Sequence, residues 1–395
     1  MTISVVKIIL GVCQLKNRKL IMIPGPTPVA RSTQNEMGRE TTAFGDPLFV
    51  KDFKGLIEDL KVMMNTDGEV FVVAGTGTMA MEMAVANETK RGDNILLVSH
   101  GFFGDRFIDL CQRKGLNVDV LASEWGKAVP VEEIDRKLSE KSYAAITVTH
   151  VDTATGVCAP VAEIGEMMKK HPETIYIVDG VCATAAEPED LTGMGIDVLL
   201  TGSQKAFGVS PGLAIVWAGK KALERRKQLG TIPEFYIDYE KWLPIMENPA
   251  KYFATPAVNL IWALKDAVRI INEEGLKERQ DRHRKVARAT QAAMEALGFR
   301  ILAEEGFRAV TLSNLIYPEG VDDLEFRNTL AEEGVFVAGG LGAYAGKMFR
   351  LGHMGNIDMH DSVSAIAAIE RTLYRLGKHS ELGKGVGVFM KEMME

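Results

Sequence analysis

One stretch of the chain reads Val198-Leu199-Leu200-Thr201-Gly202-Ser203-Gln204-Lys205-Ala206-Phe207. Its first residues have the branched, apolar pattern of a buried strand, and Lys205 follows just past the end of that strand. Lysine is rarely buried without a partner, and a desolvated amine is favoured in its neutral, nucleophilic form. Taken alone, the stretch fits a solvated lysine in a surface loop better, since most lysines are solvated.

Short apolar runs alternate with amphipathic segments from about residue 50 to residue 220. Strands are predicted at Glu69–Val73, Asn94–Ser99, Asn117–Leu121, Ala144–Thr149, Thr174–Val178, Val198–Thr201 and Leu213–Trp217. Helical patterns lie between them, at Met79–Lys90, Asp105–Lys114, Val131–Ser139 and Val161–His171. This alternation predicts an α/β fold with a mostly parallel seven-stranded sheet that helices cover on both faces.

The pattern changes near residue 255 to long helices, predicted at Val258–Glu274 and Leu276–Leu297. Shorter strands and helices follow, as in an α+β domain. For a chain of 395 residues, two domains are the default expectation. We predict an N-terminal extension over residues 1–20, a large domain over residues 21–270 and a small C-terminal domain over residues 271–395. The helix that begins near Pro256 is expected to connect the two domains.

The composition excludes several classes of protein. The net charge of −7 comes from 46 basic and 53 acidic residues without long runs of one sign, which argues against nucleic acid or an anionic membrane as a partner. No apolar run reaches the ~20 residues of a membrane span. The cysteines lie far apart and suggest neither disulfides nor a metal site: Cys13, Cys111, Cys158 and Cys182. These features predict a cytoplasmic protein.

A turn with glycine and threonine, Ala74-Gly75-Thr76-Gly77-Thr78, lies between a predicted strand and the helix after it. Glycine allows a tight turn, and the free N–H groups at a helix start favour an anion. The spacing is neither a dinucleotide fingerprint nor a Walker loop. A plain strand-to-helix turn capped by a threonine remains the alternative.

Other groups at predicted strand ends give the lysine a chemical context. Asp179 follows an apolar strand, at the edge where open α/β sheets bind ligands. A carboxylate there could keep the pyridine nitrogen of pyridoxal phosphate protonated, while the lysine carries the cofactor. Phe103, or its neighbour Phe102, could stack on the ring, and Val181 could close its other face. Helix capping for Asp179 and core packing for the apolar residues are the alternatives.

Several motifs together resemble one family. The chain is similar to class V aminotransferases of fold type I, in the branch of alanine–glyoxylate, serine–pyruvate and archaeal aspartate aminotransferases. The resemblance runs from Met22-Ile23-Pro24-Gly25-Pro26-Thr27-Pro28 to Phe349-Arg350-Leu351-Gly352-His353-Met354-Gly355. Its most specific motifs are Gly202-Ser203-Gln204-Lys205, His150-Val151-Asp152-Thr153-Ala154-Thr155-Gly156 and Thr255-Pro256.

The resemblance implies roles for residues around the cofactor ring. Lys205 would form the Schiff base with pyridoxal 5'-phosphate and move a proton during the reaction. Asp179 would pair with the pyridinium nitrogen, and Thr153 would hydrogen-bond the phenolic oxygen. Phe103 would stack on the ring, and Val181 would pack behind it.

The resemblance also implies contacts to the phosphate and the substrate. The phosphate would be bound by Thr76, Gly77, Thr78 and Gln204. Tyr252 and Thr255 resemble a pair that reaches the phosphate of the neighbouring subunit, which implies a homodimer with shared active sites. Arg350 would bind the substrate α-carboxylate, since its planar fork of donors suits that group, and the backbone of Gly25 would lie nearby.

The implied activity is ping-pong transfer of an amino group from alanine or serine to glyoxylate or pyruvate. A broad-specificity aspartate aminotransferase that uses 2-oxoglutarate is the alternative, disfavoured because no second arginine for a distal carboxylate is evident. Specificity stays open because Phe44-Gly45-Asp46 stands where many relatives carry a His-Arg pair. A cysteine desulfurase would need a cysteine after Cys182, and a non-catalytic aminotransferase-like subunit would not need Lys205.

Overall fold

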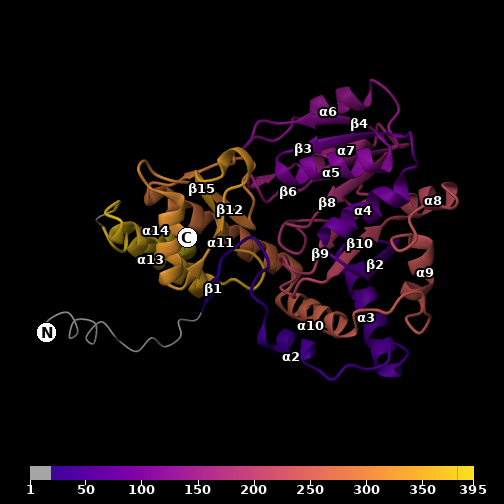
Figure 1. Ribbon diagram of the computed structural model, residues 1–395, viewed down its shortest axis with the longest axis horizontal. Coiled ribbons are helices and arrows are strands. Elements are labelled where there is room, and N and C mark those ends of the chain that lie inside the picture. The colour runs from indigo at the N-terminus through magenta and orange to yellow at the C-terminus, as the bar shows by residue number, and fades with distance from the viewer. Residues whose placement is uncertain (1–18, 380) are drawn as a thin grey trace.

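The computed structural model describes residues 19–379 and 381–395, which form two lobes lying side by side (Figure 1). The larger lobe is built on a seven-stranded sheet. Its strands, in spatial order, are β2 (Glu69–Ala74), β10 (Leu213–Ala218), β9 (Val198–Gly202), β8 (Ile175–Asp179), β5 (Ala145–Thr149), β3 (Asn94–Ser99) and β4 (Asn117–Ala122).

The sheet is mostly parallel, as predicted. Only β10 runs antiparallel to its two neighbours, β2 and β9, and the other pairs are parallel. Every residue of β5, β8, β9 and β10 is buried, whereas β4 at the sheet edge is half exposed. Burial on both faces explains why the central strands are nearly continuous apolar runs.

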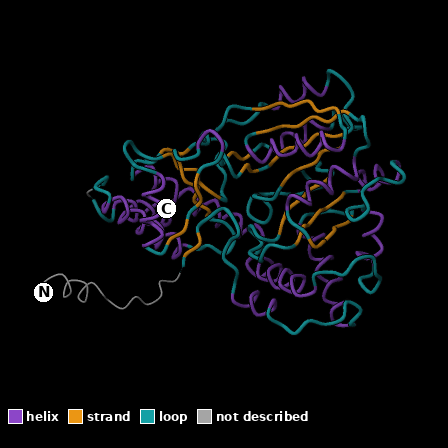
Figure 2. Tube along the Cα trace, viewed as in Figure 1, coloured by secondary structure: helices purple, strands orange, loops and turns teal. Residues whose placement is uncertain are grey.

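Helices surround this sheet (Figure 2). They are α2 (Arg31–Met37), α3 (Pro47–Met63), α4 (Gly77–Glu88), α5 (Phe102–Lys114), α6 (Val131–Leu138), α7 (Val161–Met168), α8 (Lys220–Gln228), α9 (Tyr239–Glu247) and α10 (Val258–Glu274). Among the helix starts, that of α3 has a clear local cause. The Asp46 carboxylate accepts from the N–H groups of Leu48 and Phe49, and Pro47 occupies the first turn.

The smaller lobe has its own antiparallel sheet, in the order β11 (Arg300–Ile301), β12 (Leu312–Ile316), β15 (Met348–Gly352) and β14 (Ala338–Gly339). Its helices are α11 (Leu276–Ala296), α12 (Asp323–Glu332), the short 3-10 helix η1 (Gly342–Tyr344), α13 (Met359–Arg375) and α14 (Lys384–Met394). A separate hydrophobic cluster fills this lobe, including Phe326, Phe349 and Ile369. The fold is therefore α/β with a C-terminal α+β part, as predicted.

Two short strand pairs complete the topology. The hairpin β6 (Val151–Asp152) and β7 (Val157–Cys158) follows the central strand β5. At the start of the described chain, β1 (Leu20–Ile21) pairs in parallel with β13 (Val335–Phe336), and Leu20 and Met22 pack into the smaller cluster. The described chain thus passes the smaller lobe at Leu20 and Met22 before it enters the larger one. The predicted N-terminal extension over residues 1–20 lies almost wholly outside the described residues. The predicted division at residue 271 itself stays a prediction.

The connection between the lobes is made by a different helix from the one expected. The helix α10, which follows Pro256, packs within the hydrophobic cluster of the larger lobe. The next helix, α11, contacts both lobes. The Arg279 guanidinium donates to the carbonyls of Ala185 and Ala206 in the larger lobe, while Ala289 and Ala293 pack into the smaller cluster.

Candidate active site

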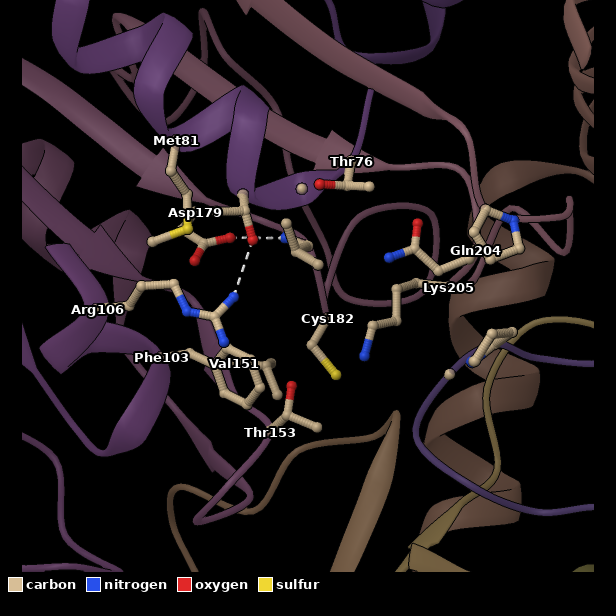
Figure 3. A pocket seen from close by; sticks show the side chains of 16 residues that line it. Thr76, Met81, Phe103, Arg106, Val151, Thr153, Asp179, Cys182, Gln204 and Lys205 are labelled. Atoms are coloured by element: carbon tan, nitrogen blue, oxygen red, sulfur yellow. Dashed lines mark hydrogen bonds between the residues drawn. The ribbon is translucent and has the colours of Figure 1, made fainter. Parts of the chain in front are cut away.

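A cavity of about 240 Å³ opens at the carboxyl ends of the central strands (Figure 3). Its lining comes from strand ends, helix starts and the first loop: Gly25, Pro26, Thr76, Gly77, Thr78, Met81, Phe103, Arg106, Val151, Thr153, Asp179, Val181, Cys182, Gln204, Lys205 and Pro211. Residues predicted for the cofactor from segments far apart in the sequence therefore lie around one space. Arg350, Tyr252 and Thr255 are not part of this lining.

Lys205 reaches into the cavity from the turn after β9. Its ammonium nitrogen donates to the carbonyl oxygen of Pro24, in the loop after β1. The adjacent Gly25 has φ +118°, and a Cβ there would come within 2.6 Å of the Lys205 side chain. Glycine is therefore required where the lysine crosses this loop. The backbone of Lys205 is also fixed, because its carbonyl oxygen accepts from the Thr27 hydroxyl at 2.6 Å.

Asp179 ends β8, the strand next to β9, so its carboxyl lies on the same edge as Lys205. One carboxyl oxygen accepts from the Val181 N–H at 3.0 Å. Burial raises the pKa of Asp179 to about 7, and nearby Asp152 also raises it, while the Val181 N–H and the cations Lys205 and Arg106 lower it. A cationic partner at this position would favour the ionised form.

The predicted phosphate turn has the geometry of an anion site. Thr76 is the N-cap of α4, and its side chain makes no capping hydrogen bond, so the first N–H groups of the helix are left for a ligand. At Gly77 a Cβ would lie 2.7 Å from the Val181 side chain, which leaves no room for a larger residue. The Gln204 side-chain amide lies opposite, and its oxygen is buried with no hydrogen-bond partner among the described residues.

Asp152 connects the segments that carry Phe103 and Thr153. One of its carboxyl oxygens accepts from the N–H groups of Phe103 and Gly104, at 2.9 and 3.1 Å. The other accepts from the Ala154 N–H at 2.8 Å. This fully buried carboxylate therefore fastens the start of α5 to the turn after β6, which places the aromatic ring and the threonine hydroxyl on the same side of the cavity.

Six lining residues were not predicted as site residues, and Arg106 and Cys182 are the two of them with reactive or charged side chains. The Arg106 guanidinium donates to the Thr78 hydroxyl at 2.9 Å, and its central carbon lies 4.8 Å from the centre of the Phe103 ring. Arg106 is three positions after Phe103 on α5, so helical spacing could have placed both on one face. Cys182 also faces the cavity. A single cysteine in an apolar setting usually packs as a small hydrophobic residue, so the sequence does not mark it as a site residue.

Arg350 lies on β15 of the smaller lobe. Its Nε donates to the Gly339 carbonyl at 2.8 Å, and no ion pair to it occurs among the described residues. Burial lowers its pKa, and Cys182 of the cavity lining and Asp152 lie close enough to raise it. A half-buried guanidinium without a bound carboxylate is suited to an anionic ligand.

Tyr252 and Thr255 lie in the exposed loop before α10. The Tyr252 side chain is 61% exposed, and its ring packs against Phe44 with centroids 5.1 Å apart. Thr255 is also exposed. Neither side chain lines the cavity of its own chain.

These groups fit pyridoxal phosphate. The uncapped start of α4 and the incompletely bonded Gln204 amide suit its phosphate, and Asp179 suits the ring nitrogen. Phe103 and Val181 flank the space between them, and Lys205 supplies the amine. The fold and this cavity together define a pyridoxal-phosphate-dependent transferase of fold type I.

Comparisons with known proteins agree with that class. The family model of class V aminotransferases matches residues 39–357. An uncharacterized aminotransferase of Methanocaldococcus jannaschii is 36% identical over 387 residues, covering 95% of this chain and 98% of that protein. The L-aspartate–glyoxylate aminotransferase of Paracoccus denitrificans is 33% identical over 375 residues, covering 93% and 94%. The chain belongs to the class V aminotransferases and is a transaminase.

Two further similarities bear on function. The soluble hydrogenase small subunit of a Synechococcus strain is 32% identical over 380 residues, covering 95% of this chain and 97% of that protein. The crystal structure of an alanine–glyoxylate aminotransferase from Nostoc sp. superimposes with a TM-score of 0.87 at 30% identity, covering 90% of this chain and 95% of that one.

No helix among the described residues is long and apolar enough to cross a membrane.

Proposed function

We propose that the enzyme transfers the amino group of a small amino acid, alanine or serine, to glyoxylate or pyruvate by a ping-pong mechanism. The observation that carries this proposal is the Lys205 amine in the cavity together with the half-buried Arg350, which has no ion pair among the described residues and lies close to the cavity residue Cys182. An amine for proton transfer and a cation for an α-carboxylate are the groups that an amino acid requires.

Bound pyridoxal phosphate would supply the carbonyl that accepts the amino group and a ring that withdraws electrons. Arg350 would bind the α-carboxylate and thereby orient the substrate Cα. The Lys205 amine would remove the proton from Cα and return it, and Asp179 would keep the ring nitrogen protonated. Phe103 and Val181 would exclude water from the two ring faces. The donor would leave as a 2-oxo acid before the acceptor enters the same site.

Arg106 bears on the choice of donor. It is a second arginine in the cavity, and aspartate would need such a group for its distal carboxylate. Its guanidinium, however, donates to Thr78 and lies near Asp179, at the end proposed for the phosphate and ring nitrogen. We therefore infer that Arg106 stabilises the cofactor rather than the substrate side chain, which favours alanine or serine. The name of the Paracoccus relative favours aspartate and keeps it as the alternative.

The donor pair is tested by a screen of the cofactor-loaded enzyme. Alanine, serine and aspartate would each be combined with glyoxylate, pyruvate and 2-oxoglutarate. We expect the highest kcat/KM for alanine or serine with glyoxylate, because glyoxylate is the acceptor in the names of two of the similar proteins. A preference for aspartate with 2-oxoglutarate would support the alternative. Parallel lines in double-reciprocal plots would support the ping-pong order.

The similarity to a hydrogenase subunit raises a non-catalytic role as a second candidate. Lys205 and Asp179 line one cavity and Arg350 lies close to its Cys182, which argues against this role, because a subunit without catalysis would not need these groups together. For a cysteine desulfurase, the described cysteines offer no candidate in the smaller lobe, since Cys111, Cys158 and Cys182 all belong to the larger one. Absence of any half-reaction with amino acids would favour the hydrogenase role.

We also propose a cytoplasmic homodimer in which Tyr252 and Thr255 reach the cofactor of the neighbouring subunit. Their exposure and their absence from the lining of their own cavity support this arrangement. The free state of Cys111, Cys158 and Cys182 fits a reducing compartment. Tyr252→Phe should weaken cofactor retention without changing the dimer, as measured by size-exclusion chromatography with light scattering. A fully active monomer would contradict the shared site.

A further inference from the structure

The two lobes contact each other on a second side, away from α11. There the loop after β4 meets the loop between β14 and β15. The rings of Trp125 and Tyr344 stack with centroids 5.6 Å apart and planes 14° from parallel. Beside them, the Glu304 N–H donates to the Gly126 carbonyl at 2.8 Å. A large-lobe loop is thus joined to the small-lobe loop that precedes Arg350.

The contact between Trp125 and this loop is close. Gly342, at the start of η1, has φ +51°, and a Cβ there would lie 2.8 Å from Cη2 of the Trp125 indole. Any larger residue would therefore collide with the indole and would also be strained by the backbone conformation. The loop approaches Trp125 as closely as a glycine permits, so the ring fixes where the loop can lie.

The same loop determines the environment of Arg350. A Cβ at Gly340 would lie 2.2 Å from the Tyr344 carbonyl oxygen, so the backbone of Gly340 packs directly against Tyr344. The preceding residue, Gly339, is the one whose carbonyl accepts the Nε–H of Arg350 at 2.8 Å. Displacement of Tyr344 would therefore displace the acceptor that orients the guanidinium.

We propose that Trp125 and Tyr344 are positioning residues for recognition of the substrate α-carboxylate. Their stack places the Gly339 carbonyl so that it takes up Nε of Arg350 and leaves the two terminal nitrogens for the carboxylate. Neither ring lines the cavity, so they act through Arg350 and not by touching substrate or cofactor. This inference rests on the proposed function of Arg350.

The test compares Trp125→Ala and Tyr344→Ala with two controls in the cofactor-loaded enzyme. Trp125→Phe keeps a ring for stacking, and Tyr374→Ala removes an exposed ring on α13 of the same lobe. L-alanine, L-serine and L-aspartate are titrated, and loss of the visible cofactor absorbance gives an apparent Kd and a limiting rate. Methylamine, which has no carboxylate, is the matched probe for reaction with the cofactor alone.

We expect both alanine variants to raise the apparent Kd of every amino acid by about tenfold or more, a loss of about 1.4 kcal/mol. The resting spectrum of both variants should match that of wild type, and their limiting rate and their reaction with methylamine should stay within about twofold of it. In the two control variants the apparent Kd of each amino acid should also stay within about twofold of the wild-type value. The double variant should be no worse than either single variant, because the rings act as one unit.

An unchanged Kd in Tyr344→Ala would overturn the proposal, even if Trp125→Ala fails to fold. An equal loss toward methylamine and the amino acids would also overturn it, because it would show a general disturbance of the site. If no amino acid changes the absorbance of the wild-type enzyme, the proposed function itself is wrong. That outcome is distinct from a failure of the positioning role.

Discussion

The Arg279 guanidinium donates a 2.7 Å hydrogen bond to the carbonyl of Ala206, the residue after Lys205. It also donates to the Ala185 carbonyl at 3.2 Å and pairs with Glu274 at 2.7 Å. Ala185 has φ +69°, a conformation that is unfavourable for alanine and must be maintained by its surroundings. The helix that connects the lobes therefore also fixes the segment that carries the lysine.

Arg279→Met should consequently affect both stability and cofactor retention. The substitution leaves two buried carbonyls without this donor, and we expect it to lower the free energy of unfolding by about 3 kcal/mol. Urea denaturation measures that loss, and the rate of cofactor release measures the loosening of the Lys205 segment. Arg284→Met, on the exposed side of the same helix, is the control and should resemble wild type. Equal rates of cofactor release in Arg279→Met and Arg284→Met would contradict the role of Arg279 in fixing the Lys205 segment.

Asp179 predicts a pH dependence of cofactor binding. Burial raises its pKa to about 7 in the absence of a bound cation, so the carboxyl is ionised only above that pH. The affinity of the cofactor-free protein for pyridoxal phosphate should therefore fall as the pH drops through about 7. Asp179→Asn should bind pyridoxal phosphate more weakly than wild type above that pH, and its affinity should not fall as the pH drops through about 7. A wild-type profile identical in shape to that of Asp179→Asn would contradict the assignment.

Arg350→Ala is expected to weaken the binding of every amino acid that carries an α-carboxylate. Loss of a buried guanidinium bound to a carboxylate typically costs several kcal/mol, so KM should rise about 100-fold with each donor. Arg350→Lys should recover only part of this loss, because an ammonium lacks the planar fork. Steady-state kinetics with alanine, serine and aspartate measures the effect. An unchanged KM for all three would remove Arg350 from the site.

Glu88 should make the stability of the protein depend on pH. It ends α4 and is fully buried, and neither carboxyl oxygen has a hydrogen-bond partner among the described residues. Burial raises the pKa of Glu88 well above its usual value, and nearby Asp197 raises it further. Because the folded-state pKa is the higher one, the contribution to stability is complete below the unfolded-state pKa. It is then lost as the pH rises toward the folded-state pKa.

Glu88→Gln removes that titration. The variant should unfold at a higher urea concentration than wild type at neutral pH, and the difference should shrink as the pH approaches about 4, where the unfolded carboxyl is protonated. Urea denaturation at several pH values measures the difference. Asp59→Asn, at an exposed position on α3, is the control. A constant difference across the pH range would contradict the account.

The sequence predicts the large lobe well because its strands carry a strong local signal. The strand Asn94–Ser99 begins and ends at the predicted residues, and the other central strands differ by only one or two. The helix Lys384–Met394 was not predicted, because glycines weaken its pattern. Its position comes from packing of Phe389 into the smaller cluster, a tertiary contact.

Part of the candidate site could be predicted from the strands, because their order in the sheet places particular residues together. Lys205 and Asp179 lie at the ends of neighbouring parallel strands, and strand order brings such residues to one edge. Arg106 was missed although it lies one helical turn after Phe103. The relation of Trp125 to Arg350 had no sequence signal at all, because it passes through a ring stack and backbone contacts between loops far apart in the sequence.

The central claim is that Lys205 carries pyridoxal phosphate covalently. Borohydride reduction of the cofactor-loaded enzyme makes such a carbon–nitrogen bond permanent, and peptide mass spectrometry then locates it. We expect the cofactor on the peptide that contains Lys205, and no labelled peptide from Lys205→Ala. A label on another lysine, or a protein that takes up no cofactor at all, would contradict the account.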